Sequence, residues 1–500
     1  YPEGLGDYSE PKMRSHPWFS LFNGYNTAWW FTAAGFGTER EGSFNPDLTV
    51  NAAFDWSMQE VREIKRGPGK LLLNCQRRHD GIAVHYSAAS DRAAYSHPFG
   101  KPHWSGAVHH ARQAIGPATF AWDMILEDLG LQYEYVCTAD IEKGALVQRG
   151  FKAFIMPVSQ SLTKKETGEI KEFVRAGGIA IADLRPGVLN SDLNPSSPGL
   201  LDDLYGISQS GGTTGPKGTR EPTQVDITVS LDNHTRHLPD SYVDEGVSPT
   251  SGVPHGGSRQ HPVVIQNSVG DGRATLLNFG IGDYYDEWRG EGALVTDLRN
   301  TSWGENIRAL VADLLAAGSV QPRVHVRQPD GKPLIAVESV FFEEGDNQYL
   351  GLLYKPDISY FLLGNVDWIG NNYDLQPDIS PQPIEVQLDR QYHVYDVRQG
   401  KYVGATDHIS TKIAPGQALL YSLLPQRVTG ISVRGPDEVT CGEQASFRLA
   451  QRTETSGEET GAAGLHCYHV EVTSPAGEVV KEYAQNVLAP EGAAGFSVPF

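Results

Sequence analysis

The stretch from residue 18 to residue 69 has the order strand, polar loop, helix, and this order constrains the fold more than any other feature of the chain. Residues 22–32 (FNGYNTAWWFT) are rich in aromatic side chains, which favours a strand, and a loop rich in Gly, Glu and Arg follows. Asn45-Pro46-Asp47 is typical of a helix start, and Gly67-Pro68-Gly69 of a helix end. Between them, apolar residues recur at helical spacing: Phe54, Met58, Val61 and Ile64.

A single strand and helix do not close a domain. The segment is therefore predicted to be the last β/α unit of a (β/α)8 barrel whose earlier strands lie outside this chain, which would be the rear part of a larger enzyme. In such barrels the functional side chains lie on the loops that follow the strands. Trp29, Trp30, Thr32 and Glu39 are then expected to face the mouth of the barrel.

Trp29 and Trp30 are the candidate substrate-binding residues. The C–H faces of a sugar ring stack on indole, so a Trp at a strand end suits the wall of a sugar site. Neighbouring residues of a strand point to opposite sides, so at most one of the two lines the pocket while the other packs under the helices. Trp30 is preferred, because it shares its face with Thr32.

Composition narrows the classes of partner. The chain has 500 residues, which suggests three or four domains, and 61 acidic against 41 basic residues give a formal charge of −20. Such an acidic chain is not expected to bind nucleic acid or an anionic membrane, whereas a neutral sugar fits. No apolar run is long enough to span a membrane, and the N-terminus has no signal-peptide pattern.

No cofactor and no metal are predicted. The four cysteines have no metal-binding spacing; Cys75 and Cys137 are expected to be buried, and Cys441 and Cys467 could pair if the protein is exported. Five histidines gather in one region, but two are neighbours that diverge by about 100 degrees on a helix and no HExxH motif accompanies them. They are interpreted as ordinary surface and capping residues: His79, His85, His103, His109 and His110.

Strands and helices alternate from about residue 80 to residue 317, which predicts a parallel sheet wrapped by helices. Strands are expected at 81–86, 132–137, 151–156 and 179–183, helices at 107–129 and 164–175, a hairpin at 262–278 and a closing helix around 307–315. The first strand lacks a GxGxxG loop, and no Cys or Ser lies in a Gly-flanked elbow with a paired His and Glu. Residues 211–218 lack the GK[ST] of a phosphate loop and are interpreted as a flexible loop.

Residues 321–425 change to short strand-like runs divided by Asp, Gly and Pro, which predicts a small antiparallel β-sandwich. A partial Ig-like β domain is expected at 428–500, with strands around 445–449 and 468–472.

The order of these segments, closing on "PGQALLYSLLP" at 415–425, resembles the glycoside hydrolase family 42 β-galactosidases over about residues 10–425. The resemblance implies a fold that is α/β plus all-β: a truncated barrel end at 1–70, a flavodoxin-like (class I glutamine amidotransferase-like) trimerisation domain at 80–320, and β-sandwich domains after it. It further implies a Trp of the eighth barrel strand in the sugar subsite, which is Trp30 or Trp29 here.

Two hypotheses of function follow. The first is a retaining glycosidase of β-galactosidase type, whose acid and nucleophile carboxylates lie upstream of Tyr1, so that no catalytic residue is assigned here and the 500 residues alone are expected to be inactive. Glu3, Asp7 and Glu10 precede the predicted strand in a Gly- and Pro-rich segment and are not expected to act as the nucleophile. The alternative is a non-catalytic oligomerisation or carbohydrate-binding protein. A carbohydrate substrate is the expected partner, and the resemblance implies a homotrimer.

Overall fold

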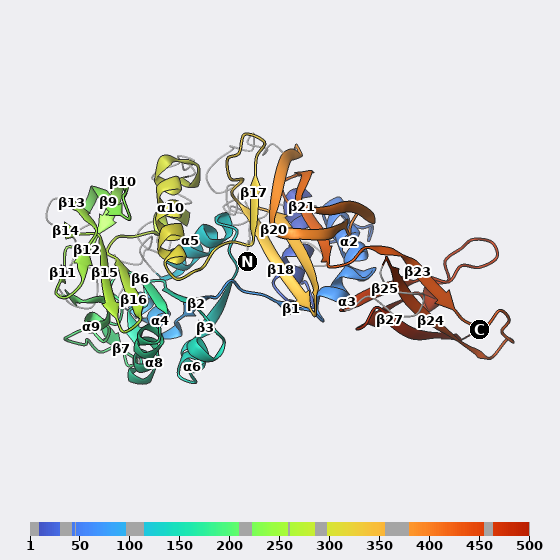
Figure 1. Ribbon diagram of the computed structural model, residues 1–500, viewed down its shortest axis with the longest axis horizontal. Coiled ribbons are helices and arrows are strands. Elements are labelled where there is room, and N and C mark those ends of the chain that lie inside the picture. Colours follow the sequence, from blue (N-terminus) through green and yellow to red (C-terminus); the bar gives the residue numbers. More distant parts are fainter. Residues whose placement is uncertain are drawn as a thin grey trace. The chain divides into compact units, whose positions relative to one another are not determined.

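The computed structural model describes residues 10–30, 43–45, 47–96, 115–209, 223–258, 261–285, 298–355, 380–454 and 464–499 (Figure 1). The chain divides into two compact units. Unit 1 contains residues 1–78 and 323–500, and unit 2 contains residues 79–322. None of the described helices is long and apolar enough to cross a membrane.

Unit 2 is built on a seven-stranded sheet with the order β12-β15-β16-β6-β4-β2-β3. Five neighbouring strands are parallel, and in chain order they lie as 2-1-3-4-5. They are β2 (Ile82–Tyr86), β3 (Tyr133–Cys137), β4 (Ala153–Met156), β6 (Ile179–Asp183) and β16 (Gly272–Leu277). The antiparallel strands β15 (Val264–Val269) and β12 (Val253–Pro254) continue the sheet at one edge.

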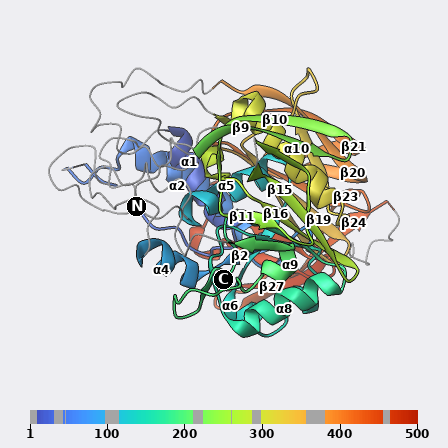
Figure 2. The same cartoon turned by 90° about the vertical axis from the view of Figure 1, so that its left-hand side faces the viewer.

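Both faces of this sheet are buried, because consecutive residues such as Phe154 and Ile155 are each fully inaccessible. Phe154 shares one core with Ile170, Phe173 and Val174 of α8 (Lys164–Arg175). Helix α8, at the bottom of the turned view, contacts β6 and β16 (Figure 2). Two further helices of unit 2, α5 (Ile115–Asp128) and α10 (Ser302–Ala316), contact each other. The shorter helices of this unit are α4 (Ala88–Ser96), α6 (Thr138–Ile141), α7 (Ala145–Gln148) and α9 (Asp202–Tyr205).

Helix α8 begins at a capping box. The Thr163 hydroxyl accepts the backbone N–H of Glu166 at 3.0 Å, and the Glu166 carboxylate accepts the backbone N–H of Thr163 at 3.1 Å. The strands predicted at 81–86, 132–137, 151–156 and 179–183, the helix at 164–175, the hairpin and the closing helix are confirmed. The predicted helix at 107–129 is confirmed from Ile115 onward, and residues 211–218 lie outside the described residues.

Unit 1 contains a seven-stranded antiparallel sheet with the order β1-β18-β19-β22-β20-β17, and β21 also pairs with β20. Its strands are β1 (Gln76–Arg77), β17 (Val324–Arg327), β18 (Val337–Glu344), β19 (Asn347–Tyr354), β20 (Gln382–Asp396), β21 (Lys401–Ile413) and β22 (Ala418–Leu424). Three helices belong to the same unit: α1 (Glu10–Phe22), α2 (Ala52–Lys65) and α3 (Pro68–Leu72).

The helices α1 and α3 cover one face of this sheet. Trp18 and Phe22 of α1 share a core with Val340 and Phe342 of β18, whereas Phe341 belongs to the core on the opposite face. This division follows from the strand period of two. Phe22 lies so close to Gly351 of β19 that a side chain there would meet its ring at 2.6 Å.

The last part of unit 1 forms two small antiparallel sheets, β23-β24-β27 and β25-β26. Their strands are β23 (Val428–Arg434), β24 (Gln444–Thr453), β25 (His466–Val470), β26 (Gln485–Ala489) and β27 (Ala493–Pro499). All four cysteines of the chain are free thiols: Cys441 is exposed, and Cys75, Cys137 and Cys467 are partly buried. The expected burial of Cys75 and Cys137 is therefore only partial.

The strand predicted at residues 22–32 is wrong. Residues up to Phe22 belong to helix α1, residues 23–30 have no strand, and residues 31 and 32 lie outside the described residues. Packing overrides the β-propensity of the aromatic residues, because Trp18, Leu21 and Phe22 recur at helical spacing and bury one face of α1. The helix predicted to open at Asn45 begins at Ala52 instead.

The turn between β15 and β16 gives a test of this packing. A Cβ on Gly272 would overlap the backbone carbonyl oxygens of Val174 and Gly178, so we expect Gly272→Ala to lower the free energy of unfolding by about 1–3 kcal/mol. Gly168→Ala, at an exposed helical site with no atom near the new Cβ, is the matched control and is expected to raise it by about 0.5–1 kcal/mol. Urea denaturation of both variants measures the difference; equal midpoints would contradict the close approach.

Candidate functional site

Trp29 and Trp30 occupy different environments. Trp29 is 80% exposed. Trp30 is partly buried, with its ring edge-on to His16 and Phe54 at centroid distances of 5.5 and 5.6 Å. Burial lowers the pKa of His16, so a neutral imidazole lies beside the indole. The other two side chains expected at a barrel mouth, Thr32 and Glu39, lie outside the described residues.

The preference for Trp30 over Trp29 depended on a predicted strand that the described residues 23–30 do not form. Without strand alternation, exposure decides which indole can meet a ligand, and the exposed side chain is Trp29. The Nε1 atom of Trp30 is buried and has no hydrogen-bond partner among the described residues. Neither residue has been tested as a ligand contact, and both stay predictions.

A buried carboxylate, Glu60 of α2, organises the polar part of unit 1. It is 5% exposed and accepts hydrogen bonds from Arg14 Nη1 at 2.8 Å, Trp18 Nε1 at 2.8 Å and Arg398 Nη2 at 2.7 Å. Arg398 follows β20, and it also binds Glu63 and lies over the Trp18 ring at 4.9 Å. Glu60 therefore connects α1, α2 and the turn after β20.

The cluster holds the two guanidinium groups of Arg14 and Arg398 between the three carboxylates of Glu10, Glu60 and Glu63. Burial alone would lower the pKa of Arg398, but Glu63 and Glu60 outweigh it and raise the pKa. The same balance, with Glu10 and Glu60 as partners, raises the pKa of Arg14. Both guanidinium groups consequently stay protonated at any pH at which the protein folds.

Proline 17 interrupts the hydrogen bonding of α1, and α2 compensates. Pro17 has no N–H, so the carbonyl of Met13 one turn earlier lacks its usual helical donor. The hydroxyl of Ser57 from α2 donates to that carbonyl at 2.5 Å. The contact satisfies a buried acceptor and fixes α2 against α1.

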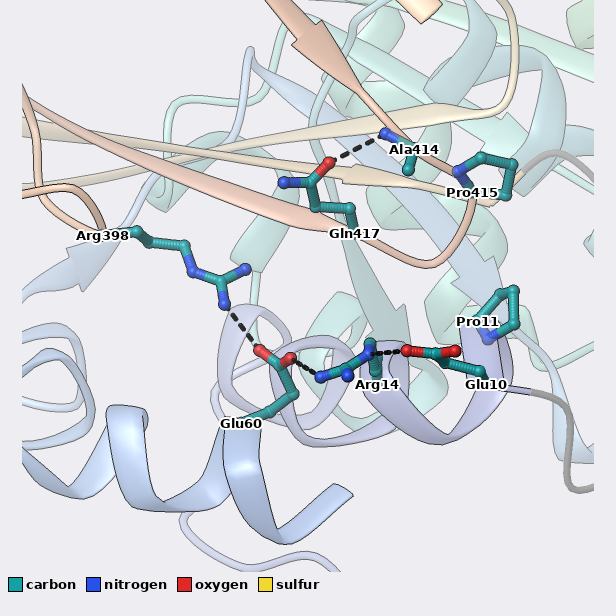
Figure 3. Close-up of a pocket in the computed structure, with 8 residues that line it drawn as sticks. All are labelled: Glu10, Pro11, Arg14, Glu60, Arg398, Ala414, Pro415 and Gln417. Carbon is teal, nitrogen blue, oxygen red and sulfur yellow. Dashed lines mark hydrogen bonds and ion pairs between the residues drawn. The ribbon is translucent and has the colours of Figure 1, made fainter. Parts of the chain in front are cut away.

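A cavity of about 360 Å³ lies beside this cluster. Figure 3 shows Glu10, Arg14 and Glu60 in a row on the two helices, with Gln417 on the opposite side of the opening. The remaining lining residues are Pro11, Arg398, Ala414 and Pro415. Its residues come from segments about 400 positions apart in the sequence.

Unit 2 contains a second polar cluster that the sequence did not reveal. His85, at the end of β2, lies with Nδ1 2.9 Å from the Ser159 hydroxyl and Nε2 2.9 Å from the Glu166 carboxylate. A hydroxyl next to an imidazole that is itself held by a carboxylate is the arrangement that activates a serine nucleophile. Ser159 follows β4 without flanking glycines, so it does not fit the Gly-flanked pattern of a nucleophile elbow. The signal available in the sequence was a His near the end of one parallel strand and a Ser after another.

The three side chains are closed to substrate, since Ser159, His85 and Glu166 are at most 1% exposed. Burial alone would raise the pKa of Glu166, but hydrogen bonds from His85, Thr163 and Thr138 outweigh it, and the pKa lies below its ordinary value of 4.5. The cluster therefore joins β2, β4 and α8 rather than presenting a nucleophile.

Among the residues that the structure describes, no group of three or more His, Cys, Asp and Glu side chains could hold a metal ion. His79 lies against the Phe151 ring, with a centroid distance of 4.6 Å, and His103, His109 and His110 lie outside that part of the chain.

The lowered pKa of Glu166 predicts a pH dependence of stability. Its stabilising contribution is complete above the unfolded pKa of about 4.5 and is lost as the pH falls through the lower folded pKa. We expect Glu166→Gln to lower the unfolding free energy at pH 7 by about 1–3 kcal/mol and to flatten the loss of stability below pH 4.5. Urea titrations between pH 3 and pH 7 measure this, with Glu169→Gln on the same helix as control; an unchanged slope would contradict the role of Glu166.

Comparisons with known proteins support the fold. No protein-family model matches the chain, and no curated protein matches it. A solved structure of a catalytic mutant of Gan42B, a GH42 β-galactosidase from G. stearothermophilus, aligns with a TM-score of 0.55 at 12% identity over 83% of this chain and 51% of that chain. The β-galactosidase of Bacillus circulans sp. alkalophilus gives 0.54 at 13% identity over 82% and 51%.

A cold-adapted β-galactosidase from Rahnella sp. R3 gives a TM-score of 0.51 at 14% identity over 82% of this chain and 51% of that chain. The chain thus spans about half the length of the solved structures that it resembles. At such low identity the likeness concerns the fold alone. The chain has a GH42-like fold of mixed α/β class.

Proposed function

We propose that this chain belongs to a retaining glycoside hydrolase that acts on β-glycosides, as a β-galactosidase-like enzyme. The observation that supports the proposal is the likeness in fold to GH42 β-galactosidase over more than four fifths of the chain. In this proposal the protonated acid and the nucleophile, a pair of carboxylates about 5 Å apart, lie on earlier barrel strands outside this chain. Unit 1 then supplies the helices α1 and α2 at the end of the barrel, without the strand predicted at residues 22–32, and the β domains that follow.

The strand order of unit 2 supports its assignment as a flavodoxin-like domain. The order 2-1-3-4-5 of its parallel strands is that of flavodoxin-like sheets. A homotrimer assembled through this domain is the oligomer that the family resemblance implies, and it stays a prediction.

Hydrolysis of an aryl glycoside tests the proposal. We expect the polypeptide isolated from its native source to hydrolyse 4-nitrophenyl β-D-galactoside or a related aryl β-glycoside, with the β-anomer as first product. The 500-residue chain alone is expected to be inactive, because one barrel end does not supply the carboxylate pair.

Proton NMR of the first product anomer and release of nitrophenolate are the two readouts. Two results would overturn the proposal. One is a native polypeptide that cleaves none of a panel of aryl glycosides. The other is hydrolysis by the 500-residue chain that disappears when one of its own carboxylates is replaced.

Exposure distinguishes the two candidate sugar contacts in the active polypeptide. We expect Trp29→Ala to raise the Michaelis constant about 2- to 10-fold, through loss of ring stacking, with little effect on stability. Trp30→Ala is expected instead to lower the unfolding free energy by about 1–3 kcal/mol, because its ring packs on His16 and Phe54. Steady-state kinetics and urea denaturation of both variants separate the roles; the reverse pattern would restore Trp30 as the sugar wall.

A further inference from the structure

The cavity beside Glu60 has the features of a binding site. Its volume of about 360 Å³ lies at the small end of the range of about 300–1,000 Å³ that is typical of small-molecule sites. Pro11, Ala414 and Pro415 form an apolar part of the wall, and charged or amide side chains form the rest (Figure 3). Such a mixture suits a small ligand that is apolar on one face and polar at its edge.

The orientation of the Gln417 amide follows from its hydrogen bond. Its Oε1 atom accepts the backbone N–H of Ala414 at 2.8 Å, and only the oxygen of an amide can accept. The Nε2 group therefore remains as a donor, with no partner among the described residues.

Arg14 and Glu10 offer complementary groups. Arg14 uses Nε for Glu10, at 2.7 Å, and Nη1 for Glu60, which leaves Nη2 unused among the residues that the structure describes. Within the same set, Glu10 accepts through Oε1 only, which leaves Oε2 as an acceptor. One cavity thus combines donors and an acceptor on side chains that are already fixed by their neighbours.

The loop that carries Gln417 is held in place. Gly416 has a φ of 74°, and a Cβ on it would overlap the backbone of Pro11 at the start of α1. This close approach fixes the loop 414–417 against α1, so the two sides of the cavity are preformed. A preformed site loses little conformational entropy when a ligand binds.

The charges of the lining select the class of ligand. Glu10 and Glu60 balance Arg14 and Arg398, and three of these four side chains are less than 30% exposed. A strongly charged ligand would therefore meet two lining side chains of its own sign as well as two of the opposite sign. A hydroxyl group, by contrast, both donates and accepts, and can bridge the free donors and the free carboxylate oxygen.

We propose that this cavity binds a neutral polyhydroxylated ligand, a single hexopyranosyl unit, whose C–H face packs on Pro11 and Pro415 while its hydroxyls meet Arg14, Glu10 and Gln417. The site goes beyond the proposed hydrolase function, because it requires binding and no catalytic step. It belongs wholly to unit 1.

Saturation-transfer NMR of the 500-residue chain with methyl β-D-galactoside, methyl β-D-glucoside and lactose tests the proposal. We expect signals from at least one of these sugars. Gln417→Glu keeps the acceptor for Ala414 but replaces the free donor by a second acceptor, and it is expected to weaken binding about 5- to 10-fold. Gln444→Glu, an exposed position in the same unit, adds the same charge and is the matched control, expected to bind as the wild type does.

Glu10→Gln is the second variant. It can keep the hydrogen bond to Arg14 while it replaces the free acceptor by a donor, and it is expected to weaken binding to a similar extent. Circular dichroism confirms that each variant folds. Absence of saturation transfer from all three sugars to the folded wild type would overturn the proposal.

Two further results would overturn it: equal binding by both variants and the control, which would place the sugar elsewhere, and binding of inorganic phosphate in place of the sugars. Because no hydrolysis is measured, these results are independent of the test of the proposed hydrolase.

Discussion

The organisation of unit 1 depends on the hydrogen bonds that the Glu60 carboxylate accepts. This carboxylate receives donors from Arg14, Trp18 and Arg398, which belong to segments far apart in the sequence. A buried carboxylate with fewer partners would be costly, and removal of one partner from such a cluster costs about 3–5 kcal/mol. The position of the Arg398 guanidinium over the Trp18 ring adds a cation–π contact to the ion pair. The position of α1 on the sheet and the shape of the cavity both follow from this cluster.

The elements of unit 2 could be predicted from the sequence, because local signals and packing agree there. Thr163 and Glu166 form a capping box before an amphipathic helix, and the buried strands are short apolar runs. In α1 the signals conflict. Pro17 argues against a helix, and only the hydroxyl of Ser57, from another helix, compensates for it. No local pattern contains that information.

The candidate sites were less predictable than the elements for a related reason. The cavity joins Glu10 and Gln417, and the His85 cluster joins three segments of unit 2; neither proximity is encoded in local spacing. Exposure also requires coordinates, which is why the preference between Trp29 and Trp30 rested on an assumed strand. The residue types alone did indicate Trp29 and Trp30 as candidate sugar contacts.

Buried carboxyls in unit 2 have opposite responses to pH. Hydrogen bonds keep Glu166 below its ordinary pKa, whereas burial raises the pKa of Asp183 to about 7, against the donors Val158 N–H and Trp122 Nε1. A carboxyl whose folded pKa is raised disfavours the folded state progressively as the pH rises from about 4 to 7, the reverse of Glu166. The two contributions act in different pH windows: Glu166 lowers the stability of unit 2 as the pH falls below about 4.5, and Asp183 lowers it as the pH rises above about 4.

Unit 2 interrupts unit 1 in the sequence, between residues 78 and 323. During synthesis the ribosome therefore releases α1, α2 and α3 long before β18, β19 and β22, the strands that form the sheet on which they pack. All strands of unit 2 are synthesised before β18, β19 and β22, so unit 2 can fold as a complete domain on the nascent chain. Until those strands emerge, the apolar faces of the three helices remain uncovered. Trp18 and Phe22 are among the side chains left uncovered at that stage, open to chaperones or to premature association.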